Sequence, residues 1–240
     1  MLNISKKFKP LVSILIANYN NKQFINRSIN SCLNQQYKNI EIIIYDDLST
    51  DGSQKVIKKY KNKKNINIIF NRKKRNVPYL DAMNAYFTMF KKSKGKYIFL
   101  LDSDDFFHSS KVCKLMKIYL ENKKIKFIQN TPKILSKKKV FTLSNNLFIS
   151  RWPFFSSTSC LSVERKYFNE FLKYNTRHYF NYPNVWLDFR LCAYSFFKRR
   201  NFISIDKPLT NYDQSRNSNQ SDLYKRFRQN WINRRYHSHK

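Results

Sequence analysis

Three acidic side chains lie close together where their chemistry could be used. Asp102, Asp104 and Asp105 follow the apolar run 97–101, in a chain with only 15 Asp and Glu residues. Carboxylates this close repel one another, and Mg²⁺ or Mn²⁺ relieves that repulsion because these ions prefer hard oxygen ligands together with substrate phosphates. Alternate residues of an extended chain point the same way, so Asp102 and Asp104 can reach one ligand. The alternative is structural: Asp105 or Ser109 caps the helix that follows.

Polar side chains also follow two earlier apolar runs. Asp46 and Asp47 come after the run 40–45, and Tyr19 comes after the run 11–17. A carboxylate there can accept hydrogen bonds from a ribose hydroxyl or a base N–H, and an aromatic ring can stack on a base. The alternative for both segments is turn formation, since Asp, Asn, Ser and Gly are common turn residues.

The elements that must position these side chains alternate along the chain. Short apolar runs predict strands at residues 11–17, 40–45, 66–70, 97–101 and 126–129. Helical spacing predicts helices near residues 24–33, 51–60, 80–90 and 112–119, and later at 164–172, 187–198 and 221–236. This alternation predicts an α/β, Rossmann-like fold with a mostly parallel sheet and helices on both faces. Ligands bind at the carboxyl ends of such strands, which is where the polar side chains lie.

We expect a single domain over residues 1–240, because no linker or repeat interrupts the chain. A nucleotide-binding half covers about residues 10–130. A half that shapes a pocket covers about residues 131–220, where the pattern is looser. Residues 221–240 form a basic helix or tail, which either packs on the domain or lies on an anionic membrane surface.

The charge balance limits the partners of the chain. Lys and Arg number 47 against 15 Asp and Glu, which gives a net charge of +32. Such a surface attracts nucleic acid, anionic lipid or phosphorylated substrates, although a codon bias toward Lys, Asn, Ile, Tyr and Phe produces the same excess. The four cysteines form no C-x-x-C pair, which argues against zinc and dithiol sites and favours a reducing, cytoplasmic location. No run approaches the roughly 20 apolar residues of a membrane span.

Two segments carry a set of motifs in a fixed order: LVSILIANYNNKQFINRSINSCLNQQYKNIEIIIYDDLSTDGS and KGKYIFLLDSDD. Together they resemble glycosyltransferase family 2, and the likeness covers about residues 10–130. Gly52 and Gly95 stand where the family commonly has glycine. The resemblance implies a GT-A fold and a nucleotide-diphospho-sugar as the donor.

The resemblance implies roles for side chains of the nucleotide site. Ala17 and Tyr19 match residues that line the base pocket. Asp47, with Asp46 beside it, matches the carboxylate that reads a uracil ring. Asn76 belongs to a loop that contacts the donor phosphates in the family.

The resemblance also implies the reacting groups. Asp102 and Asp104 match the D-x-D motif that holds ribose and metal, here Mn²⁺ or Mg²⁺. Asp105 extends the motif as a further metal ligand, and Ser103 is placed among the donor-binding residues. Asp188 falls where the family has its catalytic base, and its structural alternative is an acid in the first turn of a helix.

A later segment and several departures from the family pattern complete the comparison. Arg216 lies in a polar, basic stretch that closes over the donor and contacts its diphosphate in the family, the alternative being a solvated loop. Val77 and Pro78 replace paired glycines, and Met83 replaces an arginine, so the phosphate contacts of that loop differ here. Leu187 replaces the acid that precedes the catalytic base.

The resemblance implies an inverting glycosyltransferase that moves a sugar from a UDP-sugar to a hydroxyl of a glycan or glycolipid, in surface polysaccharide or lipopolysaccharide biosynthesis. One base and no enzyme nucleophile means direct displacement, which inverts the anomeric centre. We expect a cytoplasmic protein, with peripheral contact at the inner face of an anionic membrane as an addition. The alternatives are a basic nucleic-acid-binding protein, a catalytically inactive relative and a nucleotidyltransferase. A nucleotidyltransferase would need a glycine-rich or basic phosphate loop near the N-terminus, and the sequence shows none.

Overall fold

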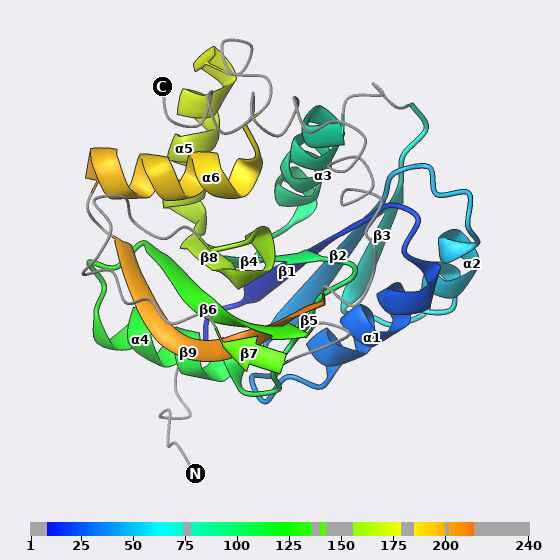
Figure 1. Ribbon diagram of the computed structural model, residues 1–240, viewed down its shortest axis with the longest axis horizontal. Coiled ribbons are helices and arrows are strands. Elements are labelled where there is room, and N and C mark those ends of the chain that lie inside the picture. The colour runs from blue at the N-terminus through cyan, green and yellow to red at the C-terminus, as the bar shows by residue number, and fades with distance from the viewer. Residues whose placement is uncertain are drawn as a thin grey trace.

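A sheet of nine strands forms the centre of the part of the chain that is described (Figure 1). The computed structural model describes residues 9–73, 78–135, 140–142, 156–178, 185–199 and 202–213. The strand order is β3-β2-β1-β4-β8-β6-β9-β5, and β7 pairs with β6. The strands are β1 Val12–Asn18, β2 Ile40–Asp46, β3 Ile66–Phe70, β4 Tyr97–Asp102, β5 Phe106–Phe107, β6 Phe127–Leu135, β7 Val140–Thr142, β8 Leu161–Glu164 and β9 Phe202–Asp213.

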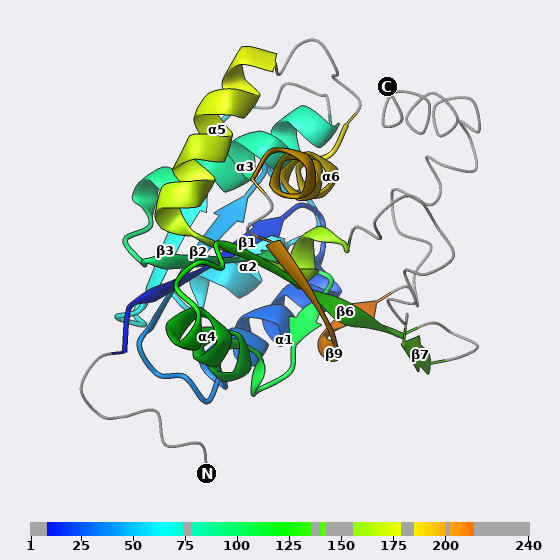
Figure 2. The ribbon, with the colours of Figure 1, turned by 90° about the vertical axis from the view of Figure 1, so that its left-hand side faces the viewer.

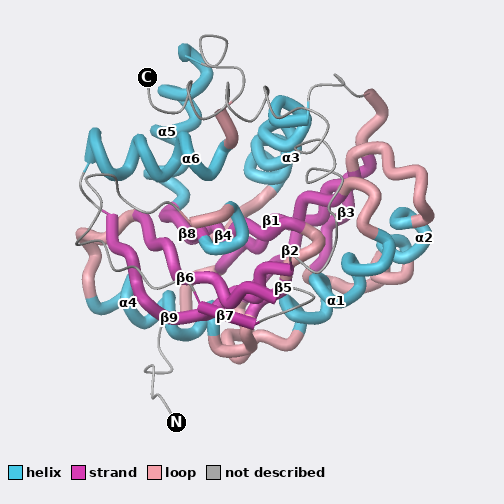
Figure 3. Tube along the Cα trace, in the orientation of Figure 1, coloured by secondary structure: helices cyan, strands magenta, loops and turns pink. Residues whose placement is uncertain are grey.

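Helices cover both faces of this sheet, as expected from the sequence. Figure 2 shows α1 and α4 on one side and α3, α5 and α6 on the other, and Figure 3 shows the strands as a continuous layer between them. The helices are α1 Lys22–Leu33, α2 Ser53–Lys58, α3 Pro78–Lys92, α4 Lys111–Glu121, α5 Arg165–His178 and α6 Leu187–Ala193. A 3-10 helix, η1 Thr158–Cys160, precedes β8, and a π-helix, η2 Tyr194–Arg199, continues α6.

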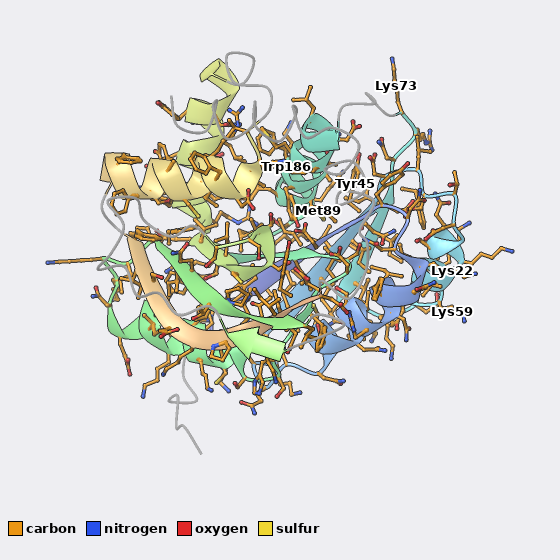
Figure 4. All side chains as sticks on the ribbon, in the orientation of Figure 1. Lys22, Tyr45, Lys59, Lys73, Met89 and Trp186 are labelled. Atoms are coloured by element: carbon orange, nitrogen blue, oxygen red, sulfur yellow. The ribbon has the colours of Figure 1, made fainter. Side chains whose placement is uncertain are left out.

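Alternation along β1 explains why the sheet is covered twice. Ile14 and Ile16 belong to the apolar core that includes residues of α1 and α4, whereas Leu15 belongs to the core that includes residues of α3, α5 and α6. Successive side chains of a strand point to opposite faces, so a run of apolar residues needs cover on both. Figure 4 shows Tyr45 and Met89, both of the second core, inside the molecule and the exposed Lys59 projecting outward.

The parallel sheet predicted for the first half is confirmed. β1 pairs in parallel with β2 and with β4, and β2 pairs in parallel with β3. In this register Asn18 lies beside Asp46, and Ala17 lies beside Asp102. The carboxyl ends of the three strands therefore meet at one edge of the sheet.

The second half contains strands that apolar runs do not reveal. The predicted strand 126–129 is confirmed as β6 but extends to Leu135. β8 joins β4 to β6 through antiparallel pairs, and β9 pairs in parallel with β6 and antiparallel with β5. The predicted helix 187–198 is confirmed as α6 followed by η2, and the predicted helix 221–236 lies outside the described residues.

Gly95 is required where the chain enters β4. A Cβ atom at this position would stand 2.4 Å from both the backbone N and the Oγ of Ser13. We expect Gly95→Ala to lower the free energy of unfolding by about 1–3 kcal/mol, because this contact with backbone can be relieved only by shifting β1. Urea unfolding measures the change. Lys94→Ala, which alters an exposed neighbour, is the control, and an equal loss in both variants would contradict the role of the close contact.

Candidate active site

Backbone hydrogen bonds fasten the three strand ends to one another. The N–H of Asp47 donates to the carbonyl of Asn18 at 2.9 Å, and the N–H of Ser103 donates to the carbonyl of Ala17 at 3.0 Å. The segments that follow β1, β2 and β4 are thus neighbours, although they are far apart in the sequence. The structure brings together the polar segments that the sequence placed at one edge.

The Asp46 carboxylate connects the segments at this edge of the sheet through hydrogen bonds. Its Oδ2 accepts from Asn18 Nδ2 at 2.7 Å, and its Oδ1 accepts from the N–H of Ser49 at 3.1 Å and from Gln54 Nε2 at 2.8 Å. The side chain is fully buried. The carboxylate that the sequence assigned to donor binding is therefore occupied by protein donors, and it positions the loops.

The loop after β1 and the turn after β2 are bonded to each other. The N–H of Asn20 donates to Ser49 Oγ at 2.9 Å, and the Asn20 side-chain oxygen accepts from the N–H of Thr50 at 2.8 Å. Asn20 takes the left-handed conformation, with φ of 50°, which asparagine tolerates better than most residues. Tyr19 stands beside it with 45% of its surface exposed.

Asp47 is held from the next strand. Asn71, directly after β3, donates from Nδ2 to Asp47 Oδ1 at 2.6 Å. Asp47 itself is 7% exposed. Asn71 was not singled out in the sequence, because an asparagine after a strand is also an ordinary turn residue.

Asp102 ends β4 and is held from both neighbouring layers. Its Oδ1 accepts from the Tyr86 hydroxyl of α3 at 2.7 Å, and its N–H donates to Ser159 Oγ of η1 at 3.0 Å. Burial, followed by the charge of Asp104, raises the pKa of Asp102 to about 7, against the lowering effect of the Tyr86 bond. Sequence reasoning missed both Tyr86 and Ser159.

Asp104 and Asp105 have different surroundings. Asp104 is partly exposed, whereas Asp105 is 1% exposed and accepts from the N–H of Asp213 at 3.0 Å through its Oδ1. Burial, with the charges of Asp104 and Asp102, raises the pKa of Asp105 well above its ordinary value. The capping alternative is wrong for Asp105, because its carboxylate binds the end of β9 and α4 begins after Ser110. Asp105 therefore anchors β9 through its Oδ1, and the metal contact expected from the sequence stays a prediction.

The fit of a divalent cation depends on the two partly exposed carboxylates. Within the described ranges, no three His, Cys, Asp or Glu side chains converge as they do in a metal cage made by protein alone. Mg²⁺ commonly takes one or two carboxylates and completes its shell with substrate phosphates. Asp102 and Asp104 fit that arrangement, since the charge of Asp104 raises the pKa of Asp102 and a cation would oppose this effect.

The side chain of Lys111 lies behind the acidic motif and is fully buried. Its Nζ donates to the Ser159 carbonyl at 2.5 Å and to Thr210 Oγ1 at 2.8 Å, and it lies 3.9 Å from the centre of the Phe107 ring. Burial lowers the pKa of Lys111 to about 7. The lysine joins η1 to β9 and so supports the serine that binds Asp102.

Asp188 approaches the same site from the second half of the chain. It lies in the first turn of α6, is partly exposed, and accepts from the N–H of Phe189 at 2.8 Å through its Oδ1. Burial raises its pKa, while the backbone N–H and hydroxyl of Thr158 lower it. The Thr158 hydroxyl also lowers the pKa of Asp102, and the charge of Asp188 raises the pKa of Asp102.

The remaining sequence assignments divide between core and undescribed chain. Ser103 is 1% exposed, and its Oγ accepts from Asn21 Nδ2 at 2.8 Å, which makes it a link to α1. Met83, which replaces an arginine of the family pattern, is fully buried in the core under α3. Asn76 and Arg216 lie outside the described residues.

The comparison with known families agrees with this geometry. Residues 13–205 match the family described as Glycosyl transferase family 2. Because this match extends over most of the chain, the chain belongs to that family.

Curated relatives share about the first half of the chain. A UDP-Glc:alpha-D-GlcNAc-diphosphoundecaprenol beta-1,3-glucosyltransferase, WfaP, from Escherichia coli is 42% identical over 117 residues, which cover 49% of this chain and 44% of that protein. A putative teichuronic acid biosynthesis glycosyltransferase, TuaG, from Bacillus subtilis is 31% identical over 115 residues, covering 48% of this chain and 44% of that protein. The chain thus spans less than half the length of these relatives.

Solved structures confirm the GT-A fold. TarS from S. aureus in complex with UDP-GlcNAc superposes with a TM-score of 0.64 at 14% identity, over 93% of this chain and 66% of that one. The mannosyltransferase PcManGT from Pyrobaculum calidifontis in complex with GDP-Man and Mn²⁺ gives a TM-score of 0.52 at 12% identity, over 68% of this chain and 47% of that one.

Proposed function

We propose that this chain is an inverting glycosyltransferase that transfers a sugar from a UDP-sugar to a hydroxyl of a glycan or lipid-linked glycan. One observation carries the proposal: Tyr19, Asp47 and the Asp102–Asp104 pair stand at one sheet edge, and Asp188 acts electrostatically on Asp102 from α6. A donor lying along that edge would place its base, its diphosphate and its sugar in this order toward Asp188. The alternative of a nucleic-acid-binding protein is less well supported, because this edge of a strongly basic chain is acidic.

The donor half of the site has a role for each side chain. The exposed Tyr19 ring stacks on the base, with Ala17 beside it, and Asp47 accepts a base N–H while Asn71 holds it. Asp102 binds the ribose, because Tyr86 and η1 fix its position. Asp46 and Ser103 position these groups from within and do not touch the donor.

Asp104, with Asp102, would hold the divalent cation that the family match and the Mn²⁺ complex of PcManGT support. When bound, such an ion neutralises negative charge on the leaving diphosphate. The protein's own part is to keep two carboxylates partly exposed and close together, which disfavours their joint ionisation until a cation arrives. Asp105 is not in this set, because its side chain is buried against β9.

Asp188 would take the proton from the acceptor hydroxyl. Burial raises its pKa, and a carboxylate of raised pKa is a stronger base at neutral pH than an ordinary aspartate. The bond to the N–H of Phe189 and the contact with Thr158 keep the carboxylate in place on α6. A single base opposite the leaving group gives inversion.

Binding of nucleotide sugars to the wild-type protein tests the function. Incubated with Mn²⁺, the protein is expected to melt at a higher temperature with UDP and UDP-sugars than with GDP-mannose or ADP-glucose, because a ligand that binds only the folded state stabilises it. At a ligand concentration of about 100 times Kd the gain is about 2.7 kcal/mol. The absence of a shift with every nucleotide sugar would contradict the proposed function. A larger shift with GDP-mannose would contradict the choice of uracil.

The acceptor side of the proposal includes a membrane surface. WfaP acts on a diphosphoundecaprenol-linked sugar, as its name states, and TuaG is named for teichuronic acid. Among the described helices, none has the length and apolar character needed to cross a bilayer. Tyr174, Phe196 and Phe197 are 40%, 38% and 60% exposed on α5 and η2, and the chain carries a charge of +32. From the exposed aromatic side chains and the positive charge, we expect the protein to sediment with phosphatidylglycerol vesicles and not with phosphatidylcholine vesicles.

A further inference from the structure

The Arg27 side chain of α1 stands where three segments meet. Its Nη2 donates to the carbonyl of Asp104 at 2.9 Å and to Asp213 Oδ2 at 2.6 Å. The guanidinium lies 4.3 Å from the centre of the Phe106 ring and 5.1 Å from that of Phe24. These contacts join α1, the acidic turn after β4 and the end of β9.

Asp213 is linked to the same turn directly through Asp105 and indirectly through Arg27. Its N–H donates to Asp105 Oδ1 at 3.0 Å, and its carboxylate pairs with Arg27. The Asp213 side chain is 5% exposed, and that of Arg27 is 38% exposed. A closed ring of bonds therefore runs from Arg27 to Asp104, along the chain to Asp105, across to Asp213 and back to Arg27.

We propose that Arg27 and Asp213 are positioning residues for donor binding, because their ion pair holds the backbone of the acidic turn in the conformation that receives the donor's diphosphate. This inference rests on the function proposed above. The Arg27–Asp213 ion pair is called the clasp below.

The geometry explains why the clasp acts on binding as well as on folding. The bond to the Asp104 carbonyl fixes the peptide between Asp104 and Asp105, which sets where each side chain leaves the chain. The described ranges contain no group of three His, Cys, Asp or Glu side chains placed to hold a metal ion, so a cation here would depend on how the backbone of this turn places the Asp104 carboxylate. Small displacements of a binding group cost large factors in activity. Arg27 also places a cation beside a group of carboxylates that must receive an anionic donor.

A second ion pair offers a matched control. Lys126 Nζ and Glu164 Oε2 lie 2.8 Å apart, with side chains 30% and 16% exposed. Glu164 pairs with Tyr97 at the amino end of β4, at the end of the strand opposite to Asp102. Lys126→Met therefore breaks a partly buried ion pair in the same sheet without touching the site.

The experiment compares UDP binding by calorimetry, donor KM and melting temperature in the wild type, Arg27→Met and Lys126→Met. We expect both variants to melt at a lower temperature than the wild type. Only Arg27→Met is expected to weaken UDP binding and raise donor KM, by about 10- to 100-fold, with acceptor KM unchanged. UDP binding of wild-type strength in Arg27→Met, or equal weakening in Lys126→Met, would overturn the proposal. A wild-type protein that binds no UDP would instead overturn the proposed function and the clasp with it.

A double-mutant cycle separates the effect of the Arg27–Asp213 interaction from the separate effects of the two side chains. Asp213→Asn keeps the shape of the side chain and one acceptor oxygen, so we expect UDP binding to weaken by only about 2- to 5-fold. Arg27→Lys keeps a positive charge, so we expect it to bind UDP more tightly than Arg27→Met and less tightly than the wild type. The loss in Arg27→Met with Asp213→Asn should be smaller than the product of the single losses, because the double variant leaves no unpaired charge. Losses that multiply fully would overturn the pairing. If Arg27→Met fails to fold, unchanged UDP binding in Asp213→Asn has the same consequence.

Discussion

Replacing Asp188 by Asn is expected to reduce kcat by about 10²- to 10⁴-fold, the usual effect of removing a general base. The amide has the shape of the carboxylate, and its oxygen can still accept from the N–H of Phe189, so α6 keeps its first turn. What is lost is the group that takes the acceptor's proton in the proposed mechanism. Kinetics with a UDP-sugar and acceptor, in parallel with calorimetry of UDP binding, measure the two effects separately.

The expected pattern distinguishes a base from a structural acid. UDP binding in Asp188→Asn should stay within about twofold of the wild type, because the proposed mechanism places Asp188 on the acceptor side of the sugar. Glu121→Gln removes a carboxylate that is 63% exposed at the end of α4 and serves as the control, with no change in kcat or binding. Turnover near the wild-type rate would show that another group takes the proton. Equal losses in kcat and UDP binding would show that the residue only shapes the site.

The sequence predicted the first half of the fold well for a physical reason. Strands buried on both faces, such as β1 and β2, must be apolar throughout, so their runs stand out without knowledge of their partners. β9 carries Asp206, Lys207 and Pro208 along its exposed part, and no local pattern marks it as a strand. It exists because β6 and β5 offer edges to pair with, and these contacts appear only in the folded chain.

The sequence predicted the location of the site but not the role of every side chain. Because the ends of parallel strands meet, the pattern of strands predicted that Asp47, Asp102 and Asp104 lie close together. Burial decides between neighbours that look equal in the sequence: Asp46 and Asp105 turn into the protein and bind protein donors.

The partners that hold the site come from distant parts of the chain. Arg27 and Asp213 are 186 residues apart, and Ser159 is 57 residues from Asp102. A tyrosine in a helix reads as core, so nothing in the sequence marks Tyr86 as the donor to Asp102. Such roles depend on contacts between residues far apart in the sequence, and these contacts leave no local sequence pattern.

Replacing Asp102 by Asn is expected to stabilise the ligand-free protein while it weakens donor binding. The pKa of Asp102 is raised from 3.8 to about 7 in the folded state, so the folded protein holds this proton more tightly than the unfolded chain does. This contribution to the free energy of unfolding is fully present below pH 3.8 and is lost as the pH rises through 7. The full shift corresponds to about 4 kcal/mol, and partial exposure reduces this to about 1–3 kcal/mol at pH 8. Asn removes that cost, and its side-chain oxygen still accepts from Tyr86.

Urea unfolding of both proteins at pH 5 and pH 8 checks the sign. The gain in the free energy of unfolding of Asp102→Asn over the wild type should be larger at pH 8, where Asp102 is ionised in the folded wild type, than at pH 5, where it is mostly protonated. Loss of a charged hydrogen bond to the donor should weaken UDP binding by about 10- to 150-fold. Glu121→Gln should show neither effect. If the gain in the free energy of unfolding were independent of pH, the pKa of Asp102 would not be raised in the folded protein. The argument that a cation relieves an unfavourable ionisation of Asp102 would then be contradicted.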